Sequence, residues 1–153
     1  MGKQRDAIRM SEAEVSAFLD ETQTISVTTL GKDGAPHMTA LWFARDGDQI
    51  LFETYGRSQK VVNLQRDPRI AVLAEAGTTY PELRGISING RAEIVDSEPQ
   101  LSSLMRRIVT RTGGPSDEAT LDQHVAAMVR KRVVIVVHPE KTVSWDHRKL
   151  AAR

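Results

Sequence analysis

Two cations and a serine stand close together in the stretch TYGRSQKVVNLQRDPRIAV, Thr54 to Val72. Arg57, Ser58 and Lys60 fall where a strand pattern ends and a helical pattern begins. The first turn of a helix attracts anions, because its backbone N–H groups lack acceptors and the helix dipole is positive there. A hydroxyl and an ammonium add to that attraction. The stretch therefore predicts a phosphate site, although a Ser58 that caps the helix between two solvated cations is an equal alternative.

No other set of residues has the spacing of a catalytic or metal site. The histidines show neither HExxH nor a paired spacing that would place two ligands on one helical face: His37, His124, His138 and His147. The chain has no cysteine, which excludes thiolate ligands and a cysteine nucleophile. We expect no metal site and nominate no catalytic acid or base.

Charge and hydropathy limit the possible partners. The 21 Lys and Arg residues against 20 Asp and Glu residues give a net charge of +1, and aromatic residues make up 5% of the chain. Both values argue against a protein that binds nucleic acid. The opening residues MGKQRDAIRM lack the apolar core of a signal peptide, and the run VVIVV (133–137) is too short to cross a bilayer. We expect a cytoplasmic protein with no membrane partner.

The order of the predicted elements indicates one domain over residues 1–153, with strands before and after a pair of helices. A capping box of Ser11 and Glu14 predicts an N-terminal helix at about 11–20. Barrel strands are expected at about 24–96 and 132–148, starting with a three-strand meander. The segment PEK (139–141) is expected to be a turn between the last two strands. Helices are expected to be inserted at about 98–131.

Short antiparallel strands joined by tight turns favour a mainly β fold with helices, closed into a small barrel. The run VVIVV is apolar at odd and even positions, so both of its faces should be buried. Either the inserted helices or a second subunit must cover its outer face. We expect a homodimer.

The motif GRSQKVVNLQRDPRIAV, with DGAPHMTALWF before it, resembles the flavin and deazaflavin oxidoreductase family. Proteins of this family have the FMN-binding split β-barrel of pyridoxamine 5'-phosphate oxidase. The resemblance runs from about residue 13 to residue 137 and implies a pocket at a dimer interface.

The resemblance also implies roles for particular residues. Ser58, Lys60 and the Gln59 backbone would hold the cofactor phosphate, with Arg57 assisting. The ring would lie against His37, Thr39 and Leu41, with Thr54 closing the floor. Asn63 would brace the turn. The partner subunit's Tyr80 or Trp145 is an alternative source of pocket wall, although packing rather than ligand contact is the expected role of both. The cofactor-binding set implied in this way is His37, Thr39, Leu41, Thr54, Arg57, Ser58, Gln59 and Lys60.

The choice of cofactor rests on the stretch RDPRIAVLAE, which resembles the deazaflavin branch of the family more closely than the pyridoxamine-phosphate oxidases. Charge is compatible with this choice but does not decide it, because an FMN site also contains Arg and Lys. Coenzyme F420 carries an oligoglutamate tail that FMN lacks, and Arg57, Lys60, Arg66 and Arg69 offer a cationic surface for it. We expect a coenzyme F420-dependent oxidoreductase that transfers a hydride to a conjugated small-molecule substrate. FMN is the alternative cofactor. The alternative class is a non-catalytic protein that binds a flavin, a deazaflavin or a haem-related ligand.

Overall fold

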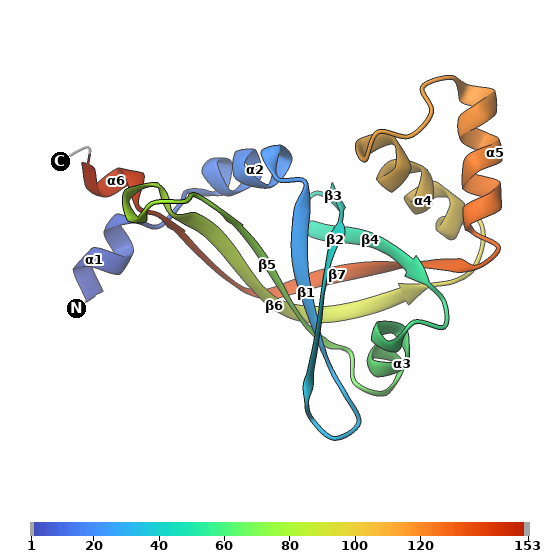
Figure 1. Ribbon diagram of the computed structural model, residues 1–153, viewed down its shortest axis with the longest axis horizontal. Helices are drawn as coiled ribbons and strands as arrows, with labels where there is room; N and C mark the ends of the chain where they lie inside the picture. The colour runs from blue at the N-terminus through green and yellow to red at the C-terminus, as the bar shows by residue number, and fades with distance from the viewer. Residues whose placement is uncertain (1, 152–153) are drawn as a thin grey trace.

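The computed structural model describes residues 2–151. Helices and strands alternate in the chain order α1 (Gly2–Ala7), α2 (Glu12–Glu21), β1 (Thr24–Leu30), β2 (Pro36–Trp42), β3 (Ala44–Asp46), β4 (Gln49–Tyr55), α3 (Gln59–Arg66), β5 (Arg69–Ala76), η1 (Tyr80–Glu82), β6 (Arg84–Val95), α4 (Gln100–Arg111), α5 (Glu118–Met128), β7 (Arg132–Asp146) and α6 (Arg148–Ala151). Figure 1 shows α4 and α5 together at one end of a curled sheet, and both chain ends at the other.

The N-terminal helix α2 begins where the sequence predicts it. Ser11 Oγ accepts from the Glu14 N–H at 3.2 Å, and the Glu14 carboxylate accepts from the Ser11 N–H at 2.7 Å. This reciprocal capping box satisfies two N–H groups that the helix itself leaves without acceptors. Phe18 and Leu19 are the buried residues of the helix, and they belong to the barrel core. Helix α1, which precedes this cap, was not predicted.

The seven strands form one antiparallel sheet in the order β2-β1-β5-β6-β7-β4-β3. The first and last strands of this order are consecutive in sequence, since only Phe43 separates Trp42 from Ala44. The expected second strand of a meander is therefore two short strands. The first pairs with β1 and the second with β4. Because one residue joins the two edges, the sheet curls into a split barrel, and the predicted mainly β fold with helices is confirmed.

Residues on the inner face of the sheet form the barrel core. Phe43 and Phe52 are fully buried there, with the β-branched side chains of Ile25, Ile135 and Val137 around them. Helix α3 adds Val61 and Leu64 to the same cluster. The barrel core therefore fixes α3, and with it the start of the helix where the sequence predicts a phosphate site.

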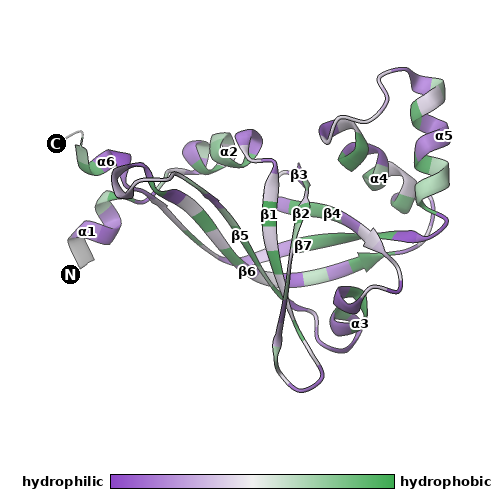
Figure 2. Ribbon diagram, in the orientation of Figure 1, coloured by the Kyte–Doolittle hydropathy of each residue, from purple (hydrophilic) through white to green (hydrophobic). Residues whose placement is uncertain are grey.

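The run VVIVV is buried on both faces, as expected, but by elements of its own chain. Ile135 and Val137 point into the barrel core, whereas Val134 and Val136 pack in a second cluster against α4 and α5. Figure 2 shows the hydrophobic stretch of β7 and the hydrophobic residues on both helices. The inserted helices cover this strand, which was one of the two expected alternatives, so the strand itself gives no support for a dimer.

Strand β7 continues through the segment PEK, where the sequence predicts a turn. Gly90 is opposite Pro139 and Asn89 is opposite Lys141, so Glu140 is an extra residue in the strand. Such a bulge accommodates a proline, which cannot donate a ladder hydrogen bond. A Cβ on Gly90 would lie 2.3 Å from the carbonyl oxygen of His138. Only glycine fits opposite this bulge.

Gly90→Ala is therefore expected to destabilise the fold by about 1–3 kcal/mol, because a backbone carbonyl must move to relieve the overlap. Thermal unfolding would measure the effect. Gly56→Ala provides a contrast, since a Cβ at Gly56 would lie 3.5 Å from the Val133 side chain, an ordinary van der Waals contact. A Gly90→Ala protein that melts like the wild type would contradict the close approach at the bulge.

Candidate functional site

The start of α3 brings three predicted site residues together. The Lys60 ammonium donates to Thr54 Oγ1 at 3.2 Å, and Thr54 Oγ1 lies 3.2 Å from Ser58 Oγ. Thr54, at the end of β4, is 6% exposed, and Ser58 and Lys60 are half-buried. We call these three side chains and the N–H groups of the first turn of α3 the anion site.

Ser58 occupies the N-cap position but does not act as a cap. Its backbone is extended, and within the described chain its side chain makes no capping hydrogen bond. The first intrahelical bond runs from the Val62 N–H to the Ser58 carbonyl. The N–H groups of residues 59, 60 and 61 therefore have no helical acceptor. The capping interpretation of Ser58 does not describe the structure, and the hydroxyl and the N–H groups remain available to an anion.

The charge of Lys60 lies in a partly apolar setting. Burial lowers the pKa of Lys60 below the ordinary range of a lysine, and a smaller attraction to Glu53 opposes this shift. Glu53 itself forms an ion pair with Arg132 at 2.6 Å. Because loss of water strengthens the interaction between a cation and a bound anion, Lys60 should hold an anion more strongly than a fully exposed lysine would.

A buried amide fixes α3 to the sheet beneath the anion site. Asn63 is fully buried and donates from Nδ2 to Thr29 Oγ1 at 3.0 Å. Its Oδ1 accepts from Gln59 Nε2 at 2.9 Å. Asn63 thus braces the helix, as expected. The Gln59 side chain is engaged in this brace, and only its backbone N–H belongs to the anion site.

The residues predicted to line the cofactor ring lie on the neighbouring strand β2. His37, Thr39 and Leu41 pair with Thr29, Val27 and Ile25 of β1 and share their face of the sheet. Among residues 2–151, the buried atoms His37 Nδ1 and Thr39 Oγ1 have no hydrogen-bond partner. Unpaired buried polar atoms are uncommon in proteins and often indicate a missing ligand or partner.

A group of exposed cations beside the anion site was not recognised in the sequence. The Gly56 N–H donates to the Lys131 carbonyl at 2.9 Å, which places the segment RKR (130–132) next to Arg57. Arg57, Arg130 and Lys131 are exposed and form no ion pair within the described part of the chain. We call these three residues the basic edge. Arg57 is far in sequence from Arg130 and Lys131, and the pairing of β4 with β7 brings it next to them.

Two arginines expected to contribute to the cationic surface have structural partners instead. Arg66 donates to the Leu30 carbonyl, and Arg69 binds both oxygens of Asp67. The Arg69 hydrogen bonds lower the pKa of Asp67 to about 2. The motif RDPR therefore closes the turn between α3 and β5.

The two aromatic residues considered for a partner's pocket occupy the opposite end of the sheet. Trp145 packs so closely over Gly85 that a Cβ there would lie 2.4 Å from the indole ring. The exposed Tyr80 ring packs against His147, with 4.6 Å between the ring centres. Neither residue belongs to the anion site of its own chain.

The described residues contain neither a cluster suited to a metal ion nor a helix suited to a membrane. Over residues 2–151, no three side chains of the His, Cys, Asp or Glu type lie close enough to hold a metal ion. No helix in that range is long and apolar enough to span a membrane. A hollow of about 1000 Å³ lies between α2 and β7, but neither Ser58 nor Lys60 lines it. In the single chain, the anion site is thus separate from this hollow.

The split barrel places this chain in the structural class of pyridoxamine 5'-phosphate oxidase. The family model described as pyridoxamine 5'-phosphate oxidase matches residues 11–146, and the chain belongs to this family.

Two curated relatives are oxidoreductases. The chain is 31% identical over 119 residues to pyridoxine/pyridoxamine 5'-phosphate oxidase of Kineococcus radiotolerans, covering 77% of this chain and 52% of the relative. It is 35% identical over 88 residues to F420H(2)-dependent biliverdin reductase of Mycobacterium tuberculosis, covering 56% and 60%. The chain thus spans between half and two-thirds of the length of these relatives.

Two solved structures share the fold of this chain. The conserved hypothetical protein Rv2991 of Mycobacterium tuberculosis has a TM-score of 0.90 and 43% identity, covering 96% of this chain and 91% of that one. A structure described as F420 reductase has a TM-score of 0.65 and 26% identity, covering 83% and 94%.

Proposed function

We propose that this protein is a homodimeric oxidoreductase that binds coenzyme F420 and transfers a hydride to a conjugated small-molecule substrate. The observation that carries the proposal is the anion site, where Lys60, Thr54 and an uncapped Ser58 meet the free N–H groups of α3. The relatives that use a flavin or a deazaflavin support the same cofactor class.

The residues of the site fit such a cofactor in two places. The anion site offers a hydroxyl, an ammonium and backbone N–H groups to a phosphate. The ring would lie along β2, where the unpaired atoms His37 Nδ1 and Thr39 Oγ1 would gain hydrogen-bond partners. Leu41 would supply an apolar contact on the same face.

The bound cofactor would supply the hydride chemistry, so the chain needs no nucleophile of its own. Lys60 and the first turn of α3 would hold the cofactor by its phosphate. Asn63 would keep that turn in a fixed position relative to β1 and β2. The residues of β2 would orient the ring and exclude water from one of its faces.

The basic edge favours coenzyme F420 over FMN. A single phosphate is accommodated by the anion site alone, whereas Arg57, Arg130 and Lys131 add three exposed charges beyond it. The oligoglutamate tail of coenzyme F420 is a polyanion that such a surface attracts. FMN remains the second candidate because its phosphate fits the anion site equally well.

A dimer would explain the exposed apolar side chains on the outer face of the sheet. Met38 and Trp42 of β2 are 66% and 52% exposed, and Leu73 of β5 is 38% exposed on the same face. Large apolar side chains grouped in this way indicate a protein interface.

Parallel titrations with coenzyme F420 and FMN would test the proposal. We expect tight binding of coenzyme F420 to the wild type and a loss of about three- to thirtyfold in the double variant Arg130→Ala/Lys131→Ala, since each exposed charge contributes up to about 1 kcal/mol. FMN binding should change less in the same variant. Equal losses for both cofactors, or tighter binding of FMN, would favour the FMN-dependent alternative.

A non-catalytic carrier is the competing function. It would bind the cofactor at the same anion site but would not oxidise it. Incubation with reduced coenzyme F420 and a panel of quinones, enones and tetrapyrroles would separate the two functions, because only an enzyme accelerates oxidation of the cofactor.

A further inference from the structure

The hollow of about 1000 Å³ lies at the mouth of the barrel, where α2 packs beside β7. Its walls come from α1, α2 and the segment between them, from β3 and the turn that follows it, and from β6 and β7. Pockets for small molecules commonly occupy barrel mouths and have about 300–1000 Å³. We call this hollow the mouth cavity.

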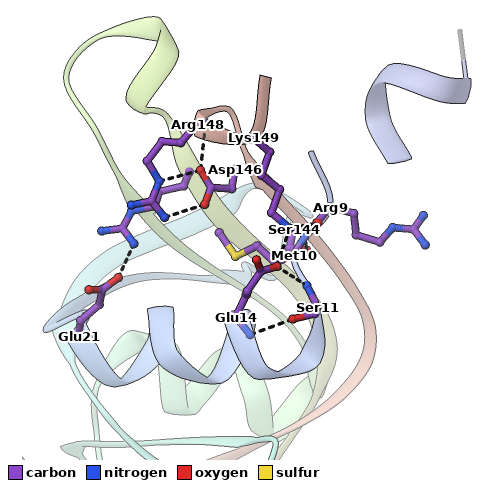
Figure 3. A network of polar contacts seen from close by, with 10 residues as sticks. Arg9, Met10, Ser11, Glu14, Glu21, Ser144, Asp146, Arg148 and Lys149 are labelled. Carbon is purple, nitrogen blue, oxygen red and sulfur yellow. Dashed lines mark hydrogen bonds and ion pairs between the residues drawn. The ribbon is translucent and has the colours of Figure 1, made fainter. Parts of the chain in front are cut away.

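The wall between α1 and α2 is fixed by contacts with the C-terminal part of the chain, as Figure 3 shows. The Met10 N–H donates to Ser144 Oγ at 3.1 Å, and the Asp146 N–H donates to the Ile8 carbonyl at 2.7 Å. The Lys149 ammonium donates to the Arg9 carbonyl at 2.7 Å and pairs with Glu14 at 2.5 Å. These bonds hold the wall in place, so the mouth cavity is part of the fold.

The lining of the mouth cavity is divided into an apolar and a cationic part. Buried or half-buried apolar side chains come from three different elements: Met10, Val15, Leu19 and Ile88. The charged residues of the lining are four cations, Arg5, Arg9, Arg45 and Lys141, and two acids, Glu12 and Asp48. Arg9 is paired with Asp6 and Arg45 with Asp20, so Arg5 and Lys141 are the cations of the lining that can meet an anionic group. Together with the apolar walls, they suit a molecule that carries both an anionic group and an apolar body.

Arg45 is the cation of this set with the most fixed position. Its side chain is 17% exposed, and its guanidinium donates to the Ser16 carbonyl at 2.7 Å and to Ser16 Oγ at 2.8 Å. Asp20 lies 3.3 Å away and offsets part of its charge. Arg5 and Lys141 are exposed and form no ion pair in the described residues, so their charges are available to a ligand.

We propose that the mouth cavity binds an amphipathic anion, a carboxylate or sulfonate on a flat apolar body, independently of the cofactor. Asp48 of the mouth cavity and Thr54 of the anion site stand near the two ends of β4. Six residues of extended strand span about 20 Å, so the two sites lie well apart. A ligand in the mouth cavity therefore leaves the anion site open.

The test compares two dyes that share one apolar body. Anilinonaphthalene sulfonate carries an anion, whereas phenylnaphthylamine is its neutral counterpart, and both gain fluorescence in an apolar pocket. We expect one sulfonate dye per chain, and an affinity for the neutral dye weaker by about three- to thirtyfold, because it gains nothing from the cations. Saturating FMN or coenzyme F420 should not displace the sulfonate dye.

Four variants locate the binding site of the dye. Val15→Trp should abolish binding by filling the mouth cavity, and Arg5→Gln/Lys141→Gln should weaken the sulfonate dye about three- to tenfold without affecting the neutral dye. Lys60→Ala and Arg91→Gln, both outside the mouth cavity, should bind the dye like the wild type.

Three outcomes would overturn the proposal. Absence of dye binding, or equal affinity for the charged and neutral dyes, would exclude an amphipathic anion site. Unchanged binding in both cavity variants would place the dye elsewhere, and loss of binding in Lys60→Ala would place it at the anion site. None of these outcomes bears on cofactor binding, so the proposed function stands or falls by its own titrations.

Discussion

Replacing Lys60 with alanine is expected to weaken the binding of a phosphate-bearing cofactor by about 1–3 kcal/mol, or roughly five- to 150-fold in Kd. The ammonium is half-buried and lies beside Thr54 and Ser58, so its interaction with an anion is less screened than at an exposed site. A fluorescence titration of the cofactor-free protein would measure the change. The variant should melt close to the wild type, because within residues 2–151 the Lys60 ammonium forms a single hydrogen bond, to Thr54 Oγ1.

Arg57→Ala is the matched control for this experiment. Arg57 is also a cation next to Ser58, but it is exposed, and it should contribute only about 0–1 kcal/mol. A larger loss in Arg57→Ala than in Lys60→Ala would mean that the phosphate lies outside the anion site. Unchanged affinity in both variants would move the cofactor to another part of the molecule.

The pKa of Lys60 adds a pH dependence to the same measurement. Burial lowers this pKa, so in the free protein Lys60 loses its positive charge at a lower pH than an exposed lysine does. Only the charged form attracts the phosphate. Affinity should therefore fall as the pH rises through the lowered pKa, and this fall should begin at a lower pH than an exposed lysine would give. Lys60→Arg should remove this fall, because arginine keeps its charge throughout that range.

Most of the fold could be predicted because local patterns determine it. The capping box at Ser11, the turn at Gly34 and the sequence Asp67-Pro68 at the end of α3 all act within a few residues. The wrong predictions concern places where the structure depends on residues far away in the sequence. Pro139 suggests a turn, yet β7 continues there because Gly90, on the neighbouring strand, leaves room for a bulge. The break at Phe43 likewise depends on where β3 finds its partner.

The candidate site was predicted in part for the same reason. Ser58 and Lys60 are neighbours in sequence, and a helix start has known chemistry. The side chain of Gln59, by contrast, turns toward Asn63. The basic edge could not be predicted from one stretch, because Arg57 meets Arg130 and Lys131 only through the pairing of β4 with β7.

Because VVIVV is buried within its own chain, a charged residue in this strand should disrupt the fold itself. Ile135 is fully buried in the barrel core, so Ile135→Glu would place a carboxylate among apolar side chains that cannot solvate it. We expect a loss of about 3–5 kcal/mol or more, which is comparable with the whole stability of a small domain. The variant should unfold or fail to express in folded form, measured by circular dichroism, whatever the oligomeric state.

Trp42→Glu should break the dimer without unfolding the chain. Trp42 is 52% exposed on the outer face of β2, so a carboxylate there remains hydrated in a monomer but is buried if a second copy covers the face. We expect the wild type to be a dimer by light scattering, and Trp42→Glu to be a monomer that melts cooperatively. If Trp42→Glu stays dimeric, the interface lies on another surface of the chain.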